Sequence, residues 1–315
     1  MNILVTGCFG FIGYHLVNQL LKTNNKIYGC DNLSSKSIET QKKRFDLLKK
    51  NTKFYFKKID LKNFLNLEKN YKTKNIDLII HLAAQPGVRI SQHKPLKTID
   101  ENIKTFVNIM EFCKKYKIKN FFYASSSSIY GNNKFFLEKN KNFNVSSIYA
   151  ASKVCNEIFA NVYNHLYNIN TLGLRFFTVY GPYGREDMAY FKFLKQIKKN
   201  NKITIYGEKN SIRSFTYIDD VIKSIILLVN KFVKKKNYND CVNIGNIKQN
   251  SLNELISLIR KYYLNKFKEI FIERNKSDVF KTKSSVLKLK KFIKYYPNTN
   301  LETGMKKFID WFKIQ

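Results

Sequence analysis

Tyr149 and Lys153 lie four residues apart in a stretch that the apolar pattern predicts to be helical, so their side chains would share one helix face. A phenol is a weak base at neutral pH, but a neighbouring ammonium group favours the phenolate, which can take a proton from a hydroxyl group. Upstream, residues 7–13 read Gly-Cys-Phe-Gly-Phe-Ile-Gly, a loop of the type that holds the phosphates of a dinucleotide. Together the loop and the Tyr-Lys pair predict a redox site.

The glycine loop joins an apolar segment expected to be a strand, residues 2–6, to a helix expected over residues 11–22. Gly7 would permit the tight turn, Gly10 would let a pyrophosphate approach the backbone, and Gly13 would let the helix pack against the strand. The free N–H groups of the helix N-terminus would bind the phosphates. The predicted cofactor contacts of this loop are Gly7, Gly10, Phe11, Ile12 and Gly13.

Asp31 follows the second expected strand, residues 26–30. A carboxylate at this position accepts hydrogen bonds from the adenosine ribose and repels a 2′-phosphate, so the sequence favours NAD over NADP. The alternative is that Asp31 only caps a helix or a turn and that the glycines form an ordinary strand–helix turn. Further cofactor contacts are expected after the second, third and fourth strands and at the nicotinamide end; they are Asn32, Asp60, Leu61, Leu82, Ala83, Ala84, Tyr149 and Lys153.

The Tyr-Lys spacing is a weak signal by itself, because a chain rich in tyrosine and lysine contains such pairs by chance, as packing and solvated residues. A serine run, residues 125–128, strengthens it. The run follows a strand expected over residues 119–124 and so emerges at the carboxyl edge of the sheet, where the glycine loop also lies. The sequence therefore predicts that the serines, Tyr149 and Lys153 meet at one site.

Strands and helices alternate through the first half of the chain. The expected strands are near residues 2–6, 26–30, 53–58, 77–82, 119–124 and 170–176, and the expected helices near 11–22, 36–50, 95–117 and 148–168. This predicts an α/β fold with a Rossmann-like, doubly wound parallel sheet. Beyond residue 176, helices near 187–198, 219–234, 251–262 and 301–314 and strands near 203–206 and 240–244 predict a smaller α/β lobe. We expect an NAD-binding domain over residues 1–176, completed by parts of 213–245, and a mainly substrate-binding lobe over 177–315.

The chain carries 57 Lys and Arg residues against 23 Asp and Glu, a formal net charge of +34. Such a charge can indicate nucleic acid or a membrane as partner, but the lysines are spread along the whole length, which favours an ordinary solvated surface. Five scattered cysteines argue against a disulfide framework and a zinc site, and the four histidines have no ligand spacing. No signal peptide or bilayer-spanning apolar run is evident. We expect a cytoplasmic protein without a metal and without a nucleic-acid or membrane partner.

On the glycine loop, the serine run and the Tyr-Lys pair, the sequence resembles the extended short-chain dehydrogenase/reductase family, and within it the nucleotide-sugar epimerases. The resemblance implies a catalytic triad of Ser126, Tyr149 and Lys153. Dehydratases of that family carry an Asp-Glu pair directly after the triad serine, whereas this chain has Ser127 and Ser128, which argues against dehydration. The resemblance also implies homodimers that pair through the helices near 95–117 and 148–168.

The similarity is closer to the UDP-glucuronate 4-epimerases, in residues 81–89 (HLAAQPGVR) and in residues 174–182 (LRFFTVYGP) on to Arg185. It implies that Thr178 and Arg185 lie near the sugar carboxylate, which an Arg fork suits better than a Lys would. It also implies that Arg213 contacts the diphosphate. The alternative for Arg185 is a surface residue with no ligand. The predicted substrate contacts are Gly87, Ser127, Ser128, Thr178, Arg185 and Arg213.

The resemblance thus implies NAD-dependent 4-epimerisation of a UDP-sugar, UDP-glucuronate to UDP-galacturonate, with polysaccharide biosynthesis as the setting. The first alternative is a UDP-glucose or UDP-N-acetylhexosamine 4-epimerase, which would not require Arg185, and the second is a non-catalytic NAD-sensing or nucleic-acid-binding protein. The chain departs from the family pattern in the expected substrate lobe: Ser214 stands for Asp, residues 276–278 (Lys-Ser-Asp) for Pro-Gly-Asp, and residues 283–285 (Lys-Ser-Ser) for Ser-Ala-Asp.

Overall fold

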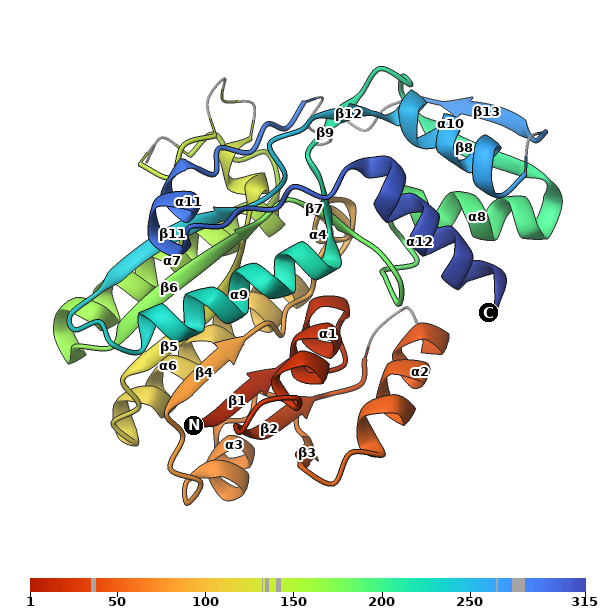
Figure 1. Cartoon of the computed structure of the whole chain (residues 1–315). Coiled ribbons are helices and arrows are strands. Elements are labelled where there is room, and N and C mark those ends of the chain that lie inside the picture. Colours follow the sequence, from red (N-terminus) through yellow and green to blue (C-terminus); the bar gives the residue numbers. More distant parts are fainter. Residues whose placement is uncertain (35–37, 132, 134–135, 140–142, 265, 274–280) are drawn as a thin grey trace.

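Seven parallel strands form the central sheet of the computed structural model, which describes residues 1–34, 38–131, 133, 136–139, 143–264, 266–273 and 281–315 (Figure 1). Their order across the sheet is β11-β6-β5-β4-β1-β2-β3, and every neighbouring pair is parallel. The strands are β1 (Asn2–Thr6), β2 (Lys26–Asp31), β3 (Phe54–Lys58), β4 (Leu78–His81), β5 (Asn120–Ser126), β6 (Asn170–Phe176) and β11 (Asn239–Ile244). The order reverses between β1 and β4, and at such a point the carboxyl ends of the strands leave a crevice for a ligand.

Helices cover both faces of this sheet because its strands carry apolar side chains on both sides. In β1, Ile3 and Val5 pack into the core on one face, and Leu4 packs into the core on the other. The first helical layer contains α1 (Phe11–Leu20), α2 (Ile38–Lys49) and α9 (Ile218–Phe232); the second contains α3 (Phe64–Tyr71), α6 (Thr105–Lys115) and α7 (Ile148–Tyr167). The predicted doubly wound, Rossmann-like α/β fold is therefore confirmed.

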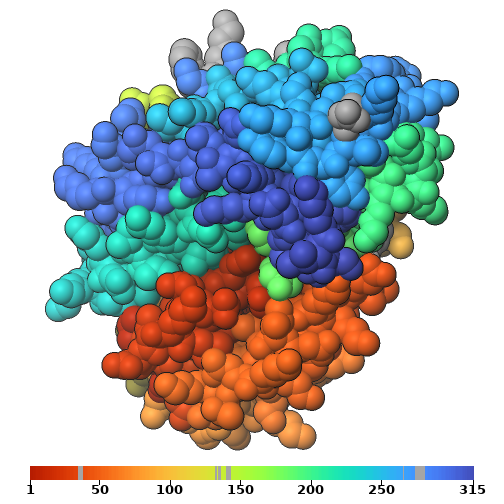
Figure 2. Space-filling model, turned by 45° about the vertical axis from the view of Figure 1, so that its right-hand side comes forward, coloured from red at the N-terminus to blue at the C-terminus, as the bar shows by residue number. Residues whose placement is uncertain are grey.

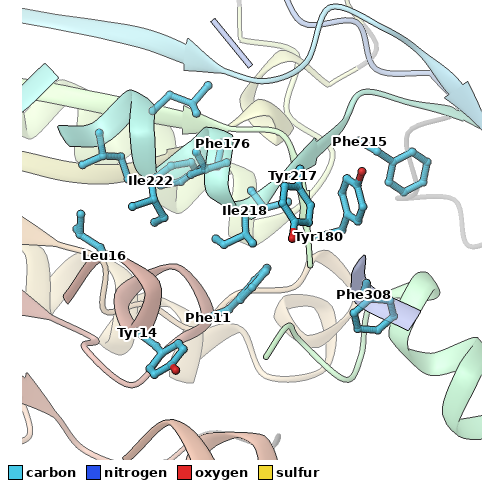
Figure 3. Packing of buried hydrophobic residues seen from close by; sticks show 14 of the residues in the cluster. Phe11, Tyr14, Leu16, Phe176, Tyr180, Phe215, Tyr217, Ile218, Ile222 and Phe308 are labelled. Carbon is cyan, nitrogen blue, oxygen red and sulfur yellow. The ribbon is translucent and has the colours of Figure 1, made fainter. Parts of the chain in front are cut away.

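A smaller α/β lobe packs onto this sheet. It contains α8 (Ala189–Asn200), β8 (Lys202–Tyr206), α10 (Leu252–Tyr262), β13 (Lys268–Ile272) and α12 (Leu301–Lys313), with β8 and β13 paired in parallel. In the space-filling view the C-terminal residues, in blue, lie above the N-terminal residues, in red and orange (Figure 2). The two parts share one apolar core, which runs from Phe11 and Tyr14 of α1 past Ile218 of α9 to Tyr180 and to Phe308 of α12 (Figure 3).

The helix expected over residues 95–117 is divided into three parts. These are α5 (Pro95–Ile99), a single π-helical turn η1 (Asp100–Lys104), and α6. The π turn contains Asn102, whose Oδ1 accepts a hydrogen bond from the backbone N–H of Gln85 (2.7 Å) and whose Nδ2 donates to Oγ of Ser152 (3.0 Å). Such turns often occur at functional sites. Here the π turn joins the loop after β4 to α7.

Several elements carry too little sequence signal to be predicted. They are α3, β13, α4 (Val88–His93), η2 (Ser127–Tyr130), β7 (Thr178–Tyr180), β9 (Ile212–Arg213), β10 (Phe215–Tyr217), β12 (Asn250–Ser251) and α11 (Leu287–Ile293). The other expected elements are present with small shifts of their ends; residues 36 and 37, expected at the start of a helix, lie outside the described residues. Within the described ranges, no helix has the length and apolar character needed to span a membrane.

Candidate active site

A cavity of about 740 Å³ lies at the carboxyl ends of the strands, at the point where their order reverses. It is lined by the glycine loop, by residues at the ends of β2, β4 and β5, by the start of α7 and by the segments 176–179 and 185–188. Of the predicted site residues, every one except Asp60 lines this cavity. One space therefore contains the predicted cofactor residues, the predicted triad and the predicted substrate residues.

The backbone leaves no room for a side chain at Gly7 or Gly13 of the glycine loop. Gly7 adopts a φ of +65°, and a Cβ atom on it would lie 2.7 Å from the backbone nitrogen of Ala83. A Cβ on Gly13 would lie 2.1 Å from the carbonyl oxygen of Gly7. Gly10 is the N-cap of α1, and within the described residues no side chain caps this helix end, which lines the cavity. The free N–H groups of this uncapped helix N-terminus face the cavity, where they could bind the phosphates of a dinucleotide.

Asp31 is fixed at the end of β2 by backbone N–H groups. Its Oδ2 accepts a hydrogen bond from Phe9 N–H (3.0 Å) and its Oδ1 accepts one from Leu33 N–H (2.8 Å). Burial raises the pKa of the Asp31 carboxyl, and these two donors and the charge of Arg44 oppose that shift. Gln41 Nε2 lies 3.4 Å from Oδ1. The carboxylate, the glycine loop and the helix end together form a cradle whose chemistry fits the ribose and phosphates of NAD.

Arg44 is a cavity residue that the sequence analysis did not identify. Its side chain is 2% exposed, and its Nη1 donates a hydrogen bond to the carbonyl oxygen of Tyr183 (2.8 Å). Burial lowers the pKa of Arg44 to about 10, which leaves it protonated at neutral pH. In the sequence Arg44 follows Lys42 and Lys43 on a strongly basic helix, so no local signal separates it from a solvated residue.

Asp60 lies at the edge of the site rather than in the main cavity. It lines an adjacent cavity together with Asn32, which belongs to both. Its Oδ1 accepts a hydrogen bond from the N–H of Lys62 (3.0 Å), and Lys62 Nζ lies 3.3 Å from Oδ2 and 3.0 Å from Oε1 of Glu101. Asp60 therefore lines the adjacent cavity, because this local turn directs its carboxylate toward Lys62, and its contact with the cofactor stays a prediction.

The start of α7 positions Tyr149 and Lys153. Ser147 caps the helix, and its Oγ accepts a hydrogen bond from Ala150 N–H (3.1 Å). Lys153 Nζ lies 6.0 Å from the centre of the Tyr149 ring. Ser126, the last residue of β5, is hydrogen-bonded to Tyr149. The structure thus brings the three residues of the predicted triad together from a strand end and a helix.

The charge that acts on the Tyr149 phenol comes from Arg185. Burial raises the pKa of the phenol, whereas the hydrogen bond with Ser126 and the charge of Arg185 lower it. The sequence analysis assigned the stabilising charge to Lys153 and did not anticipate the contribution of Arg185. Lys153 is 2% exposed, and burial lowers the pKa of its ammonium group to about 8. A phenol, a hydroxyl and a readily deprotonated ammonium group can relay a proton at this point.

Arg185, whose charge acts on Tyr149, also lines the cavity and forms a bidentate ion pair with Asp187. Nε of Arg185 lies 3.0 Å from Oδ1 and Nη2 lies 2.6 Å from Oδ2. Thr178 begins β7, and Arg213 ends β9, where its Nη1 donates a hydrogen bond to the carbonyl oxygen of Ile212. The lining of the cavity therefore includes two guanidinium groups and the Thr178 hydroxyl, donors that suit an anionic ligand. Asp187 was missed by the sequence analysis.

The departures at Ser214 and at residues 283–285 lie against each other. Ser214 Oγ accepts a hydrogen bond from Ser284 N–H (3.0 Å), and Ser214 N–H donates to Oγ1 of Thr282 (3.2 Å). Thr282 lines the cavity beside Arg213. Ser214 and Ser285 thus carry hydroxyls where the family pattern has carboxylates, whereas Ser284 stands where that pattern has Ala. Residues 276–278 lie outside the described residues. In the described part of the chain, no group of three or more His, Cys, Asp or Glu side chains could hold a metal ion.

Comparisons with known proteins agree with this geometry. The sequence profile of the NAD dependent epimerase/dehydratase family matches residues 3–245. The chain is similar to the UDP-glucuronate 4-epimerase of Thermodesulfobacterium geofontis, with 37% identity over 313 residues that cover 98% of this chain and 95% of that protein.

Solved structures give the same result. The fold is similar to that of the UDP-glucuronic acid 4-epimerase of Bacillus cereus in complex with UDP-glucuronic acid and NAD, with a TM-score of 0.92, 31% identity, and coverage of 100% of this chain and 99% of that one. The UDP-glucose 4-epimerase of Thermotoga maritima with UDP-glucose is similar with a TM-score of 0.89, 26% identity, and coverage of 100% and 99%.

Proposed function

The chain belongs to the NAD-dependent epimerase/dehydratase family, and we propose that it interconverts UDP-glucuronate and UDP-galacturonate by oxidation and re-reduction at C4. The observation that carries the choice of sugar is the position of Arg185, which lines the same cavity as Tyr149 and lowers the pKa of its phenol. A guanidinium this close to the reacting end suits a sugar that carries a carboxylate.

Tyr149 acts as the base that removes the proton of the sugar C4 hydroxyl and returns it at the end of the cycle. Ser126 holds the reacting oxygen through the hydroxyl that now contacts Tyr149. Lys153, whose ammonium group is buried, orients the nicotinamide ribose and favours the phenolate. NAD, when bound, supplies the acceptor and donor of the C4 hydride.

The remaining residues bind and orient the two ligands. Asp31 accepts the hydroxyls of the adenosine ribose, and the helix N-terminus at Gly10 binds the pyrophosphate. Thr178 and Arg185 hold the sugar carboxylate, and Arg213 contacts the diphosphate of the UDP-sugar. The further contacts we propose with the cofactor are Gly7, Phe11, Ile12, Gly13, Asn32, Leu61, Leu82, Ala83 and Ala84, with Asp60 at the edge; those with the sugar are Gly87, Ser127 and Ser128.

The deciding experiment compares initial rates of the purified protein on UDP-glucuronate and on UDP-glucose, with sugar analysis of the products. We expect UDP-glucuronate to give UDP-galacturonate with the higher kcat/KM. A UDP-glucose 4-epimerase is the second candidate, since the fold is also similar to such an enzyme. Faster turnover of UDP-glucose would favour that candidate.

We further propose that the protein is a homodimer that pairs through α7 and its neighbour α6. Three apolar residues lie on one face of α7 at four-residue spacing and are exposed: Ile158 (53%), Val162 (40%) and Leu166 (57%). A stripe of this kind on a helix is typical of a buried interface. A second copy of the chain would cover it with the same face, as in a two-fold dimer.

We keep the proposed division into an NAD-binding domain over residues 1–176, completed by parts of 213–245, and a substrate lobe. Two features support it: β11 pairs with β6 in the main sheet, and α9 packs against α1. A cytoplasmic location is consistent with the unpaired cysteines, of which Cys8, Cys30 and Cys113 are buried. A uronic-acid nucleotide would serve polysaccharide biosynthesis.

A further inference from the structure

The segment that carries Arg185, residues 182–187, is held in a strained conformation. Tyr183 has a φ of +55°, in the left-handed region, which costs a residue with a side chain about 1–2 kcal/mol. Two side chains, the half-buried His15 and the buried Arg44, fix the backbone around it. His15 Nε2 of α1 lies 2.9 Å from the carbonyl oxygen of Pro182, and Arg44 Nη1 of α2 donates to that of Tyr183 at 2.8 Å. Backbone strain that is maintained by several contacts is often found at ligand sites. We call residues 182–187 the Arg185 segment.

Glu186 connects the Arg185 segment to two helices. Thr40 Oγ1 of α2 donates a hydrogen bond to Oε1 of Glu186, and Lys195 Nζ of α8 lies 2.7 Å from Oε2. Thr40 is buried, and the Glu186 side chain is only 17% exposed. Partial burial and two simultaneous partners make this contact stronger than an exposed surface ion pair. Glu186, the residue directly after Arg185, is therefore joined to both α2 and α8.

Glu186 lies between Arg185, whose guanidinium would bind the sugar carboxylate, and Asp187. Arg185 presents its Nε and Nη2 atoms to Asp187, which fixes the plane of the guanidinium. Both residues and Glu186 line the cavity. The orientation of the guanidinium therefore depends on the backbone of the Arg185 segment, and this backbone is held in place by α2.

We propose that Glu186 is a positioning residue for recognition of an acidic sugar: by its contacts with Thr40 and Lys195 it fixes the Arg185 segment on α2, so that Arg185 is oriented before the sugar carboxylate binds. This inference rests on the function proposed above. Fixing a binding group in advance removes the entropy cost of ordering it on binding. Because α2 also carries Gln41 and Arg44 beside Asp31, one helix connects the ribose end of the cavity to the carboxylate end.

The test uses the protein with its bound cofactor and four variants. These are Glu186→Gln, Thr40→Val, the double variant, and Glu39→Gln as a matched control. Glu39 also lies near Lys195, at 3.8 Å, but its side chain is 81% exposed. We expect Glu186→Gln to raise the KM for UDP-glucuronate about tenfold, which corresponds to about 1.4 kcal/mol, with little change in kcat or in the KM for UDP-glucose.

Two further results are expected if Glu186 and Thr40 act as one unit. The double variant should raise the KM for UDP-glucuronate no more than Glu186→Gln alone does, because the effects of coupled residues are not additive. Amide hydrogen exchange should become faster at residues 183–188 in Glu186→Gln, and stay unchanged at the start of α7. Glu39→Gln should resemble the wild type in every measurement.

An unchanged KM for UDP-glucuronate in Glu186→Gln, or an equal loss on both sugars, would overturn the inference, since either result removes the link to the carboxylate. If the wild type does not turn over UDP-glucuronate at all, the proposed function fails. The inference is then decided by calorimetry with UDP-glucuronate and UDP-glucose and by the exchange of residues 183–188. If Glu186→Gln changes neither the amide hydrogen exchange of residues 183–188 nor the affinity for UDP-glucuronate, the inference is wrong.

Discussion

Arg175 and Glu157 form a buried bidentate ion pair directly beneath the triad. Nε of Arg175 lies 2.9 Å from Oε1 and Nη2 lies 2.7 Å from Oε2, with the two side chains 4% and 7% exposed. Ser125 Oγ donates to the same Oε1 at 2.6 Å. Glu157 lies one helical turn beyond Lys153 on α7, Arg175 lies on β6, and Ser125 lies on β5. One carboxylate therefore sets the distance between the strand that carries Ser126 and the helix that carries Tyr149.

Replacing Glu157 by Gln should destabilise the protein by on the order of 3 kcal/mol, because the buried Arg175 charge loses its partner. Chemical denaturation gives the free energy of unfolding. Glu302→Gln is the control, since Glu302 pairs with Lys261 at the surface, with side chains 50% and 61% exposed. A loss no larger than that of the control would mean that the pair contributes little to stability.

Tyr149→Phe keeps the ring and removes the ionisable oxygen. We expect turnover to fall by roughly 10²-fold or more, because a proton acceptor at this position contributes about that factor. The content of bound NAD and the circular dichroism spectrum should match those of the wild type, which separates lost chemistry from lost structure. Activity near the wild-type level would show that another group removes the proton.

Lys153→Met should stabilise the cofactor-free protein at pH 7. In the folded state burial lowers the pKa of Lys153 from 10.5 to about 8. Between pH 8 and pH 10.5, Lys153 is therefore protonated in the unfolded chain and mostly neutral in the folded protein. The wild type therefore has an unfolding free energy that is reduced below pH 8 and recovers as the pH rises toward 10.5.

We expect Lys153→Met to be more stable than the wild type by on the order of 2 kcal/mol at pH 7, and this difference to shrink as the pH rises above 8. Denaturation curves across this pH range measure it, with the exposed Lys231→Met as the control. A variant that is less stable at pH 7 would contradict the assignment of a destabilising buried charge to Lys153.

Arg185→Ala should change the product as well as the rate. Oxidation of glucuronate at C4 gives a β-keto acid, which loses carbon dioxide when the carboxylate can align with the carbonyl π system. Arg185 and Thr178 would hold the carboxylate out of that alignment. We expect Arg185→Ala, and Thr178→Ala to a lesser degree, to lose epimerisation and to release some UDP-4-keto-pentose, carbon dioxide and NADH; mass spectrometry detects the nucleotide sugar and absorbance detects the NADH.

Activity of Arg185→Ala on UDP-glucose should be damaged much less. Arg260→Ala serves as the control, because Arg260 lies on α10 and pairs with Glu269. Epimerisation of UDP-glucuronate by Arg185→Ala at the wild-type rate, with no decarboxylated product, would remove Arg185 as the carboxylate anchor and favour a neutral sugar.

Val162→Glu should convert the proposed homodimer to a monomer without unfolding it, because a carboxylate on the apolar face of α7 would be buried unpaired in the interface. Sedimentation velocity measures the oligomeric state. Leu287→Glu on α11, where the native leucine is 74% exposed, is the control and should remain dimeric. A wild type that sediments as a monomer at tens of micromolar would contradict the dimer.

The sequence determined those features that depend on residues close together in the chain. A helix has 3.6 residues per turn, so the spacing of Tyr149 and Lys153 already places both on one face of α7. Likewise the spacing of Gly7, Gly10 and Gly13 within one turn and one helix start specifies the phosphate loop. Alternating apolar strands and helices specify a doubly wound sheet, because strand polarity then brings their carboxyl ends to one edge.

Only the tertiary structure decided which polar groups meet across long stretches of chain. Arg44 contacts the backbone at Tyr183, and Thr40 contacts Glu186, 146 residues away. Asp60 pairs with Lys62, which also pairs with Glu101, and does not line the main cavity. The apolar pattern fixes the faces of each element but not its register against distant loops, and a charged residue carries the same local signal whether it becomes buried or solvated. Which residues surround Arg185 is therefore decided by how the helices pack.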